Sequence, residues 1–209
     1  MHSYFRNPSR SIFWRSLQHL LLLMVLVGAT AACANKGAVA PEPSNEWPLA
    51  WQDKDGDCQD TETEVLIAQI SGLVQWASPD ACAIAAGQWK SWGSDQAVPL
   101  SSVLVVMVVV PSNAQASGAQ DWSMGEKLAF MNDEENLIIL DTASAKVRAN
   151  YGPDRWVPHK KYWCEYATRW RNVKQRYGLT LSEEEDGATA HMMAVACELS
   201  KEADKKPMP

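Results

Sequence analysis

The stretch Ser102-Val103-Leu104-Val105-Val106-Met107-Val108-Val109-Val110-Pro111 decides the fold of this chain of 209 residues. It is a run of mainly β-branched side chains closed by a proline, and it predicts one strand over residues 103–110. The run is too short to span a membrane, which takes about 20 apolar residues. Because apolar side chains occupy both faces of this strand, we expect burial on both faces at the centre of the core.

A second strand and a helix are predicted further along the chain. The apolar residues 136–140 have the composition of a buried strand, and residues 142–149 are compatible with a short helix directly after it. Strand, loop, strand and helix in this order make a ββα unit.

The C-terminal part predicts two further helices. Residues 160–177 carry aromatic and aliphatic side chains at three- and four-residue spacing, which indicates an amphipathic helix that ends at Gly178. Ser182 and Glu185 have the spacing of a capping box for a last helix. Residues 201–209 are predicted to form a disordered tail. The expected fold class is therefore α+β.

Residues 1–32 have the pattern of an export signal. Three arginines and no acid precede or flank an apolar run over residues 20–27, and small residues follow it. The sequence Thr30-Ala31-Ala32-Cys33 resembles a bacterial lipobox, so we expect lipidation of Cys33 and a membrane as partner through this anchor. Ordinary signal cleavage near this position is the alternative.

The residue after the lipobox cysteine indicates where such a lipoprotein goes. It is Ala34 rather than aspartate, which in a Gram-negative cell resembles the outer-membrane sorting pattern. We therefore expect an exported protein of the cell envelope that faces the periplasm. Residues 33–45 are rich in Pro, Ala, Gly and Ser and predict a flexible tether, so the folded domain is expected over residues 46–200.

Four further cysteines, Cys58, Cys82, Cys164 and Cys197, are an even number in an oxidising compartment. Three connectivities are possible. We favour Cys58–Cys82 and Cys164–Cys197, because each pair closes a short loop. A zinc site is the alternative, and it is less favoured because no CxxC motif or clustered histidine accompanies these cysteines.

An acidic segment resembles a calcium-binding loop. Asp53, Asp55 and Asp57 alternate, and Glu64 stands at the twelfth place, which are carboxylate positions of such loops. The sixth place, where glycine makes the sharp turn, is Cys58. A solvated turn held by a disulfide is therefore the favoured interpretation, with calcium as the alternative.

Charge limits the class of partner. The formal net charge is -6, and it falls to -9 without residues 1–32, which argues against polyanion binding over the whole surface. Between residues 146 and 176, however, nine Lys and Arg face two acids. A nucleic acid could be contacted there. The favoured alternative is a helix face whose arginines stack on tryptophans or pair with the acidic run 183–186. The candidate residues flank an aromatic stripe and are Arg169, Arg171, Lys174 and Arg176.

Several pieces of the chain, in order and over residues 47–197, resemble one family. This family is the exported HNH-type proteins related to the C-terminal domain of the GmrSD restriction endonuclease, and the resemblance implies a ββα-metal core in a helical surround. The matching pieces are Gly56-Asp57-Cys58-Gln59-Asp60-Thr61, Thr63-Glu64-Val65-Leu66-Ile67, Ser117-Gly118-Ala119, Ala129-Phe130-Met131-Asn132-Asp133, Asn136-Leu137, Pro153, Trp156, Pro158, Tyr162-Trp163-Cys164-Glu165-Tyr166 and Arg176-Tyr177-Gly178-Leu179-Thr180.

The chain departs from this family at the residues that carry the chemistry. The family's first strand ends in Asp-His, two residues and Pro, so alignment on Pro111 puts Met107 and Val108 at the Asp and His positions. The asparagine of the family's helix becomes Ala145, and the arginine after its Cys-Gln-Asp-Thr motif becomes Glu62. HNH chemistry needs a histidine as general base and a divalent metal for the phosphate charge, and valine and alanine supply neither function.

These departures lead to the functional hypothesis. We expect a non-catalytic HNH-like lipoprotein that serves as a binding or envelope-structural module, without a cofactor and with a protein partner that the sequence does not identify. The alternative is an active exported DNA endonuclease that uses a divalent metal and a relocated base. That alternative needs His159 as base, or Asp141 as a metal ligand, close to the end of strand 103–110.

Overall fold

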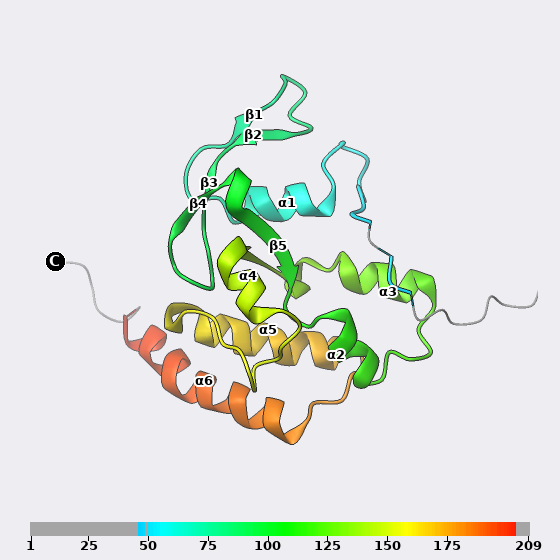
Figure 1. The fold of residues 1–209 in the computed structure, drawn as a ribbon, viewed down its shortest axis with the longest axis vertical. Coiled ribbons are helices and arrows are strands. Elements are labelled where there is room, and N and C mark those ends of the chain that lie inside the picture. Colours follow the sequence, from blue (N-terminus) through cyan, green and yellow to red (C-terminus); the bar gives the residue numbers. More distant parts are fainter. Residues whose placement is uncertain (1–45, 49, 204–209) are drawn as a thin grey trace, which may run out of the picture. The chain divides into compact units, whose positions relative to one another are not determined.

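An antiparallel pair of strands, β5 and β6, lies between the helices (Figure 1). The structure is a computed structural model and describes residues 46–48 and 50–203. Strand β5 spans Val103–Met107 and β6 spans Leu137–Asp141, with Val105 opposite Ile139. Both strands are therefore confirmed, although their bounds differ from the prediction.

Strand β5 is shorter than the apolar run that predicts it. The Val108 N–H still donates to the main-chain carbonyl of Asn136 at 2.7 Å, opposite it in the register, but the next N–H, that of Val109, donates to the side chain of Asn136, and the regular pairing ends there. The predicted burial of both faces also fails at Leu104, whose side chain is 41% exposed. Val108, Val109 and Val110 are buried without being part of the strand.

The two faces of the strand pair belong to two hydrophobic clusters. Alternation along β5 and β6 sends successive side chains to opposite faces. One cluster lies toward α4 and α5, and its strand residues include Val106, Ile138 and Leu140. The other lies toward α1 and contains Val103, Leu137 and Ile139. The pair of strands thus forms the middle layer between two packed sets of side chains.

Helices cover both faces of this pair. Helix α4, Thr142–Arg148, begins directly after β6 and packs against both strands, so the predicted order of strand, strand and helix is confirmed. Helix α1, Thr61–Ala68, packs on the opposite face (Figure 1). The predicted helix end at residue 149 is off by one position, because Ala149 is the C-cap.

Short elements complete the fold around this centre. Strand β1 pairs with β2, and β3 pairs with β4, each pair antiparallel. Their bounds, and those of the short helices between the strands, are Gln75–Trp76 (β1), Ile84–Ala86 (β2), Gln88–Lys90 (β3), Ala97–Pro99 (β4), Leu100–Ser102 (η1), Pro111–Ala116 (α2), Met124–Met131 (α3) and Glu134–Asn136 (η2).

The C-terminal helices pack side by side. A short 3-10 turn, η3, spans Lys160–Tyr162 and leads into α5, Trp163–Arg176, so the helix predicted over 160–177 is confirmed in the main. Helix α6 spans Glu183–Ala203, and both hydrogen bonds of the capping box at its start are present. The predicted tail begins at residue 201, but helix α6 continues through Ala203.

Two disulfides bind the chain together. Cys58–Cys82 pins the acidic loop to the β1–β2 region, and Cys164–Cys197 joins α5 to α6. The favoured connectivity is confirmed, and the zinc alternative for these cysteines is excluded. The fold is thus a disulfide-containing mixture of helices and small sheets. The predicted signal segment, Cys33 and the predicted tether lie outside the described residues. None of the helices within the described ranges has the length and apolarity that crossing a bilayer requires.

One strained residue at the end of α4 generates a stability prediction. Ala149 has φ 47° and ψ -121°, a backbone conformation that favours glycine. We expect Ala149→Gly to raise the free energy of unfolding by about 1 kcal/mol, measured by urea denaturation. The matched control is Ala143→Gly inside the same helix, which should lower it by about 0.5–1 kcal/mol. Destabilisation by Ala149→Gly contradicts the assigned strain.

Candidate functional site

The end of β5, where it faces α4, is where the family resemblance puts an active site. Val108 is fully buried, and Ala145 of α4 packs against the same hydrophobic cluster. The positions aligned with the family's histidine and asparagine are therefore in one apolar region. Met107 packs against this cluster and against the second cluster on the α1 side of the strands. Together with Trp51 and Met131 it lines a small apolar cavity of about 170 Å³.

A buried cation lies beside this apolar region. Arg148, in the last turn of α4, is 2% exposed, and its guanidinium donates a hydrogen bond of 2.6 Å to the carbonyl oxygen of Val108. The same guanidinium lies 5.5 Å from the ring centre of Trp156. Burial lowers the pKa of Arg148, and interaction with Tyr166 opposes that effect. Within the described ranges Arg148 has no ion pair.

Asn136 fixes the end of β5 from the other side. Its side-chain oxygen accepts from the N–H of Val109 at 2.8 Å, and its amide group donates to the carbonyls of Val109 and Phe130. The residue is fully buried. Sequence reasoning gave Asn136 no role, because its main partner, Val109, lies 27 residues away in the chain.

Asp141 has a structural role at the start of α4. It is the N-cap, and its carboxylate accepts from the N–H of Ser144 and from the hydroxyls of Ser144, Ser91 and Ser94 at 2.6–2.9 Å. Burial by itself raises the pKa of Asp141, but the serine hydrogen bonds outweigh it and hold this pKa well below its usual range. Both carboxylate oxygens are thus engaged within the protein, which leaves little for a metal ion.

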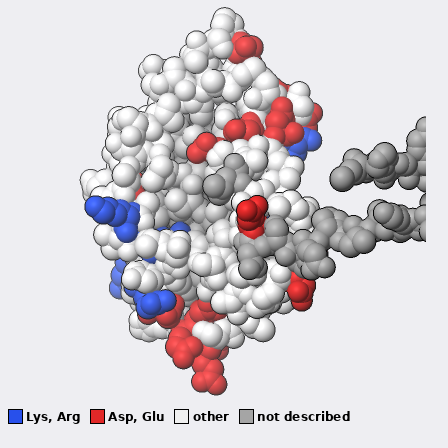
Figure 2. Space-filling view, turned by 45° about the vertical axis from the view of Figure 1, so that its right-hand side comes forward, with Lys and Arg blue, Asp and Glu red and all other residues white. Residues whose placement is uncertain are grey.

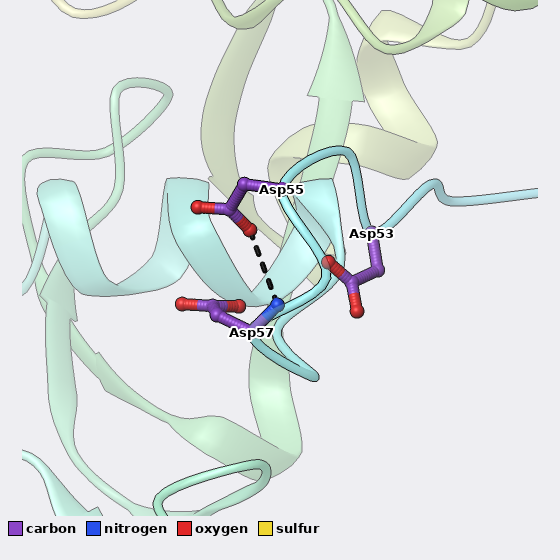
Figure 3. A group of neighbouring side chains, drawn as sticks. All are labelled: Asp53, Asp55 and Asp57. Carbon is purple, nitrogen blue, oxygen red and sulfur yellow. Dashed lines mark hydrogen bonds between the residues drawn. The ribbon is translucent and has the colours of Figure 1, made fainter.

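The acidic loop brings three of its four candidate ligands together (Figure 3). Carboxylate oxygens of Asp53, Asp55 and Asp57 lie within 4.8 Å of one another and are exposed. Each residue also accepts main-chain N–H bonds within the loop; Asp53, for example, accepts from Gly56 and Cys58. These three residues could hold a cation.

Glu64, the fourth predicted calcium ligand, is not part of that group. It lies on α1, and no group of metal-binding side chains in the described part of the chain includes it. Burial first, and then the carboxylates of Glu134, Asp55 and Asp57, raise the pKa of Glu64, with Lys54 opposing them. The contacts of the loop agree best with the solvated, disulfide-held turn.

The candidate replacement base is exposed. His159 is the N-cap of η3; its ring Nδ1 accepts from the main-chain N–H of Lys161 at 3.4 Å, and its main-chain N–H donates to the carbonyl of Trp92. The described contacts include none between His159 and Val108, Ala145 or Asp141. The structure therefore does not bring the proposed base and metal ligand together.

Two of the basic residues on α5 contact the strand region and α6. Arg169 donates to the carbonyls of Glu134 and Leu137, pairs with Glu165 at 2.9 Å, and lies 5.2 Å from the ring centre of Trp92. Arg171 pairs with Asp186 of α6 at 2.5 Å. These are the stacking and pairing contacts of the favoured alternative.

The other two basic residues on α5 are also paired. Lys174 and Glu185 form a buried ion pair at 3.1 Å, with 2% and 7% of their side chains exposed. Arg176 pairs with Asp133 at 2.7 Å. On the face shown in Figure 2, acidic side chains gather at the upper right and at the lower end, and most of the Lys and Arg side chains lie at the left. This face offers no continuous basic track for phosphates.

A similar curated protein comes from the fungus Arthroderma benhamiae and is described as an uncharacterized secreted protein. It is 33% identical over 116 residues, which are 54% of this chain and 57% of that protein. The chain thus spans little more than half the length of the relative that it matches. No family model matches the chain, and no solved structure matches it.

Because the ion pair between Lys174 and Glu185 is buried, we expect its removal to change the stability of the fold and not the binding of a partner. Lys174→Met leaves Glu185 buried without its cation and should cost about 3–5 kcal/mol of unfolding free energy. Adding Glu185→Gln should restore part of this loss, and a double-mutant cycle by urea denaturation measures the coupling.

The exposed pair on the same helix is the control. Arg171→Met should change stability by less than about 1 kcal/mol, because its ion pair is partly solvated. Titration of duplex DNA into this variant tests the nucleic-acid interpretation. A salt-dependent loss of DNA affinity in Arg171→Met at unchanged stability contradicts the assignment of α5 to structure alone.

Asp141 predicts an acid dependence of stability. Because its folded pKa is below the unfolded value of 3.8, its contribution is complete above that value and is lost as the pH falls toward the folded pKa. We expect Asp141→Asn to be about 1–3 kcal/mol less stable at pH 7, and to lose less stability than the parent between pH 5 and pH 2. Urea denaturation at several pH values measures this. Parallel pH profiles of the two proteins contradict the assignment.

Proposed function

We propose that this protein is an exported, non-catalytic module that keeps an HNH-like ββα scaffold and uses it for binding or for structure in the envelope. One observation carries the proposal. The positions aligned with the catalytic histidine and asparagine, Val108 and Ala145, pack into one hydrophobic cluster, and the Arg148 guanidinium is hydrogen-bonded to the Val108 carbonyl.

The hydrophobic cluster around Val108 and Ala145 lacks groups that bind a metal or accept a proton. A divalent metal needs oxygen or nitrogen ligands, and a general base needs a lone pair near pH 7. Valine and alanine offer neither. A metal ion beside Arg148 also meets a fixed positive charge in a medium of low polarity, where like charges repel strongly. These features favour retention of the scaffold over retention of nuclease chemistry.

Export is supported by two independent observations. Two disulfides are typical of oxidising compartments, and the relative from Arthroderma benhamiae is described as secreted. The predicted signal segment adds the lipid anchor on Cys33, and with it a place on the outer membrane, as the finer part of this proposal.

The competing function is a metal-dependent DNA endonuclease with a relocated base. It requires His159 or Asp141 to act near the end of β5. His159 is exposed and has no described contact there, and Asp141 already accepts four hydrogen bonds. The contacts of both residues weigh against this function.

A nuclease assay on the purified, disulfide-bonded protein tests the proposal. With plasmid DNA and Mg²⁺, Mn²⁺ or Zn²⁺, we expect no cleavage above that of a mock purification. The decisive comparison uses EDTA and the variant His159→Ala. Turnover that both treatments abolish contradicts the proposal and establishes the competing function; cleavage that His159→Ala leaves unchanged comes from a source other than that base.

A further inference from the structure

The outer edge of β5, on the side away from β6, has no strand beside it in the described part of the chain. The strand is also partly open to solvent, since Leu104 is 41% exposed. An unpaired strand edge presents a row of main-chain N–H and C=O groups that a second extended chain can join. The sheet of β5 and β6 therefore has an open position next to β5.

The hydrogen-bond pattern shows which main-chain groups point to this edge. In an antiparallel pair, residues that exchange hydrogen bonds alternate with residues that do not. The Val108 N–H donates to the carbonyl of Asn136, so the main-chain groups of Val108 face β6. Ile139, opposite Val105, has its carbonyl on the side away from β5, where it accepts from the Trp92 N–H. The residues whose N–H and C=O groups point to the outer edge are therefore Val103, Val105 and Met107.

These outward groups of β5 have no hydrogen-bond partner in the described part of the chain. The outer edge of β6 is different, because its groups are satisfied within the protein. The carbonyl of Leu137 accepts from Arg169, and the N–H of Asp141 donates to the Ser91 hydroxyl. Only one side of this two-stranded sheet is thus available for pairing.

A small apolar cavity lies beside the available edge. It has a volume of about 170 Å³, and Val105 and Met107 of β5 form part of its wall. The rest of the wall is made by Ala50, Trp51 and Met131. An extended chain along the outer edge sends every second side chain to the same face of the sheet as these two β5 residues. One apolar side chain of such a chain can therefore enter the cavity.

Acidic segments follow two parts of the cavity wall. The exposed acids that they contribute, none of them in an ion pair in the described part of the chain, are Asp53, Asp55, Asp57, Glu134 and Glu135. The two segments act on a common neighbour on α1, because burial first, and then the carboxylates of Glu134 and Asp55, raise the pKa of Glu64. The electrostatic field there favours an approaching chain with positive charge.

We propose that the outer edge of β5 is a docking site for an extended, basic peptide segment of a partner protein. The peptide adds a third strand to the sheet, places one apolar side chain in the cavity and directs lysine or arginine toward the acids. The main-chain ladder supplies affinity, and the cavity and the acids supply specificity. This site gives a partner class to the binding role proposed above and rests on that role, whereas the nuclease assay tests the absence of catalysis separately.

Two other chains could occupy the edge, and both suit it less well. A second copy brings no cation on its own β5, and its acidic loop repels the first one when the two edges meet. The segment of this chain before Glu46 contains Pro41 and Pro43, and proline lacks the N–H that a strand ladder uses.

Binding of a fluorescent synthetic peptide to the intact, disulfide-bonded protein tests the proposal. In this peptide lysine alternates with threonine, and leucine replaces the central threonine. The same peptide with methylated main-chain nitrogens keeps every side chain but cannot donate to a ladder, so we expect it to bind at least about tenfold more weakly. Glutamate in place of lysine should also weaken binding, and added salt should reduce that difference.

Three variants locate the site on the protein. Val105→Pro removes an N–H that has no partner in the free protein and should weaken binding by about tenfold. Ala50→Phe fills the cavity and should also weaken binding. Leu104→Thr is the matched control, because its side chain lies on the other face of β5, and it should bind as the parent does. If Val105→Pro does not fold, as judged by thermal unfolding, the methylated peptide and Ala50→Phe decide.

Amide hydrogen exchange identifies the occupant of the edge. The N–H of Val105 should exchange fast in the free protein and become protected when the peptide is added. Protection without peptide that disappears on dilution shows a second copy at the edge and overturns the proposal. Protection without peptide at every dilution shows that the chain covers its own edge and also overturns it. Equal binding of the methylated and unmethylated peptides overturns it as well.

Discussion

The hydrogen bond from Arg148 to the carbonyl of Val108 is the contact around which the centre of the molecule is arranged. A guanidinium is costly to bury unless its charge and its N–H groups find partners. This bond holds the last turn of α4 against the residue that follows β5, 40 positions away in the chain. The strained residue Ala149 follows Arg148 directly, as the C-cap of α4.

The same contact limits the chemistry of the site. A ββα unit that binds a metal presents polar ligands between strand and helix, and it leaves a place for an ion and a phosphate. Here Val108 and Ala145 both pack in one hydrophobic cluster. The positive charge beside them is that of the Arg148 guanidinium, which is bonded to the Val108 carbonyl. Under the proposed function, valine and alanine at these two positions cost the scaffold little stability, because small apolar side chains pack well between a strand and a helix. The proposed absence of catalysis is therefore physically compatible with a stable unit of two strands and a helix.

Local patterns in the sequence predicted what depends on neighbours in the chain, and missed what depends on distant contacts. The apolar runs and the capping box at Ser182 follow from spacing alone, and loop length favoured the two disulfides that form over the other connectivities. The end of β5 does not, since it depends on Asn136, which is 27 residues from Val109. The role of Asp141 was missed for the same reason: two of its serine partners lie 47 and 50 residues away. A carboxylate after a strand has the same sequence appearance whether it caps a helix or binds a metal.

The distribution of paired and unpaired charges decides what kind of surface remains for a partner. The cations of α5 pair with acids from elsewhere in the chain, as in Arg176 with Asp133 and Lys174 with Glu185, so their fields are largely cancelled. None of the ion pairs in the described part of the chain involves Asp53, Asp55 or Asp57, and these three neighbouring acids (Figure 3) are exposed. Two cations, Arg148 and Lys174, are buried, whereas the acids of this loop are exposed. An approaching polyanion meets repulsion at this loop, so long-range electrostatics favour a neutral or basic partner over a nucleic acid there.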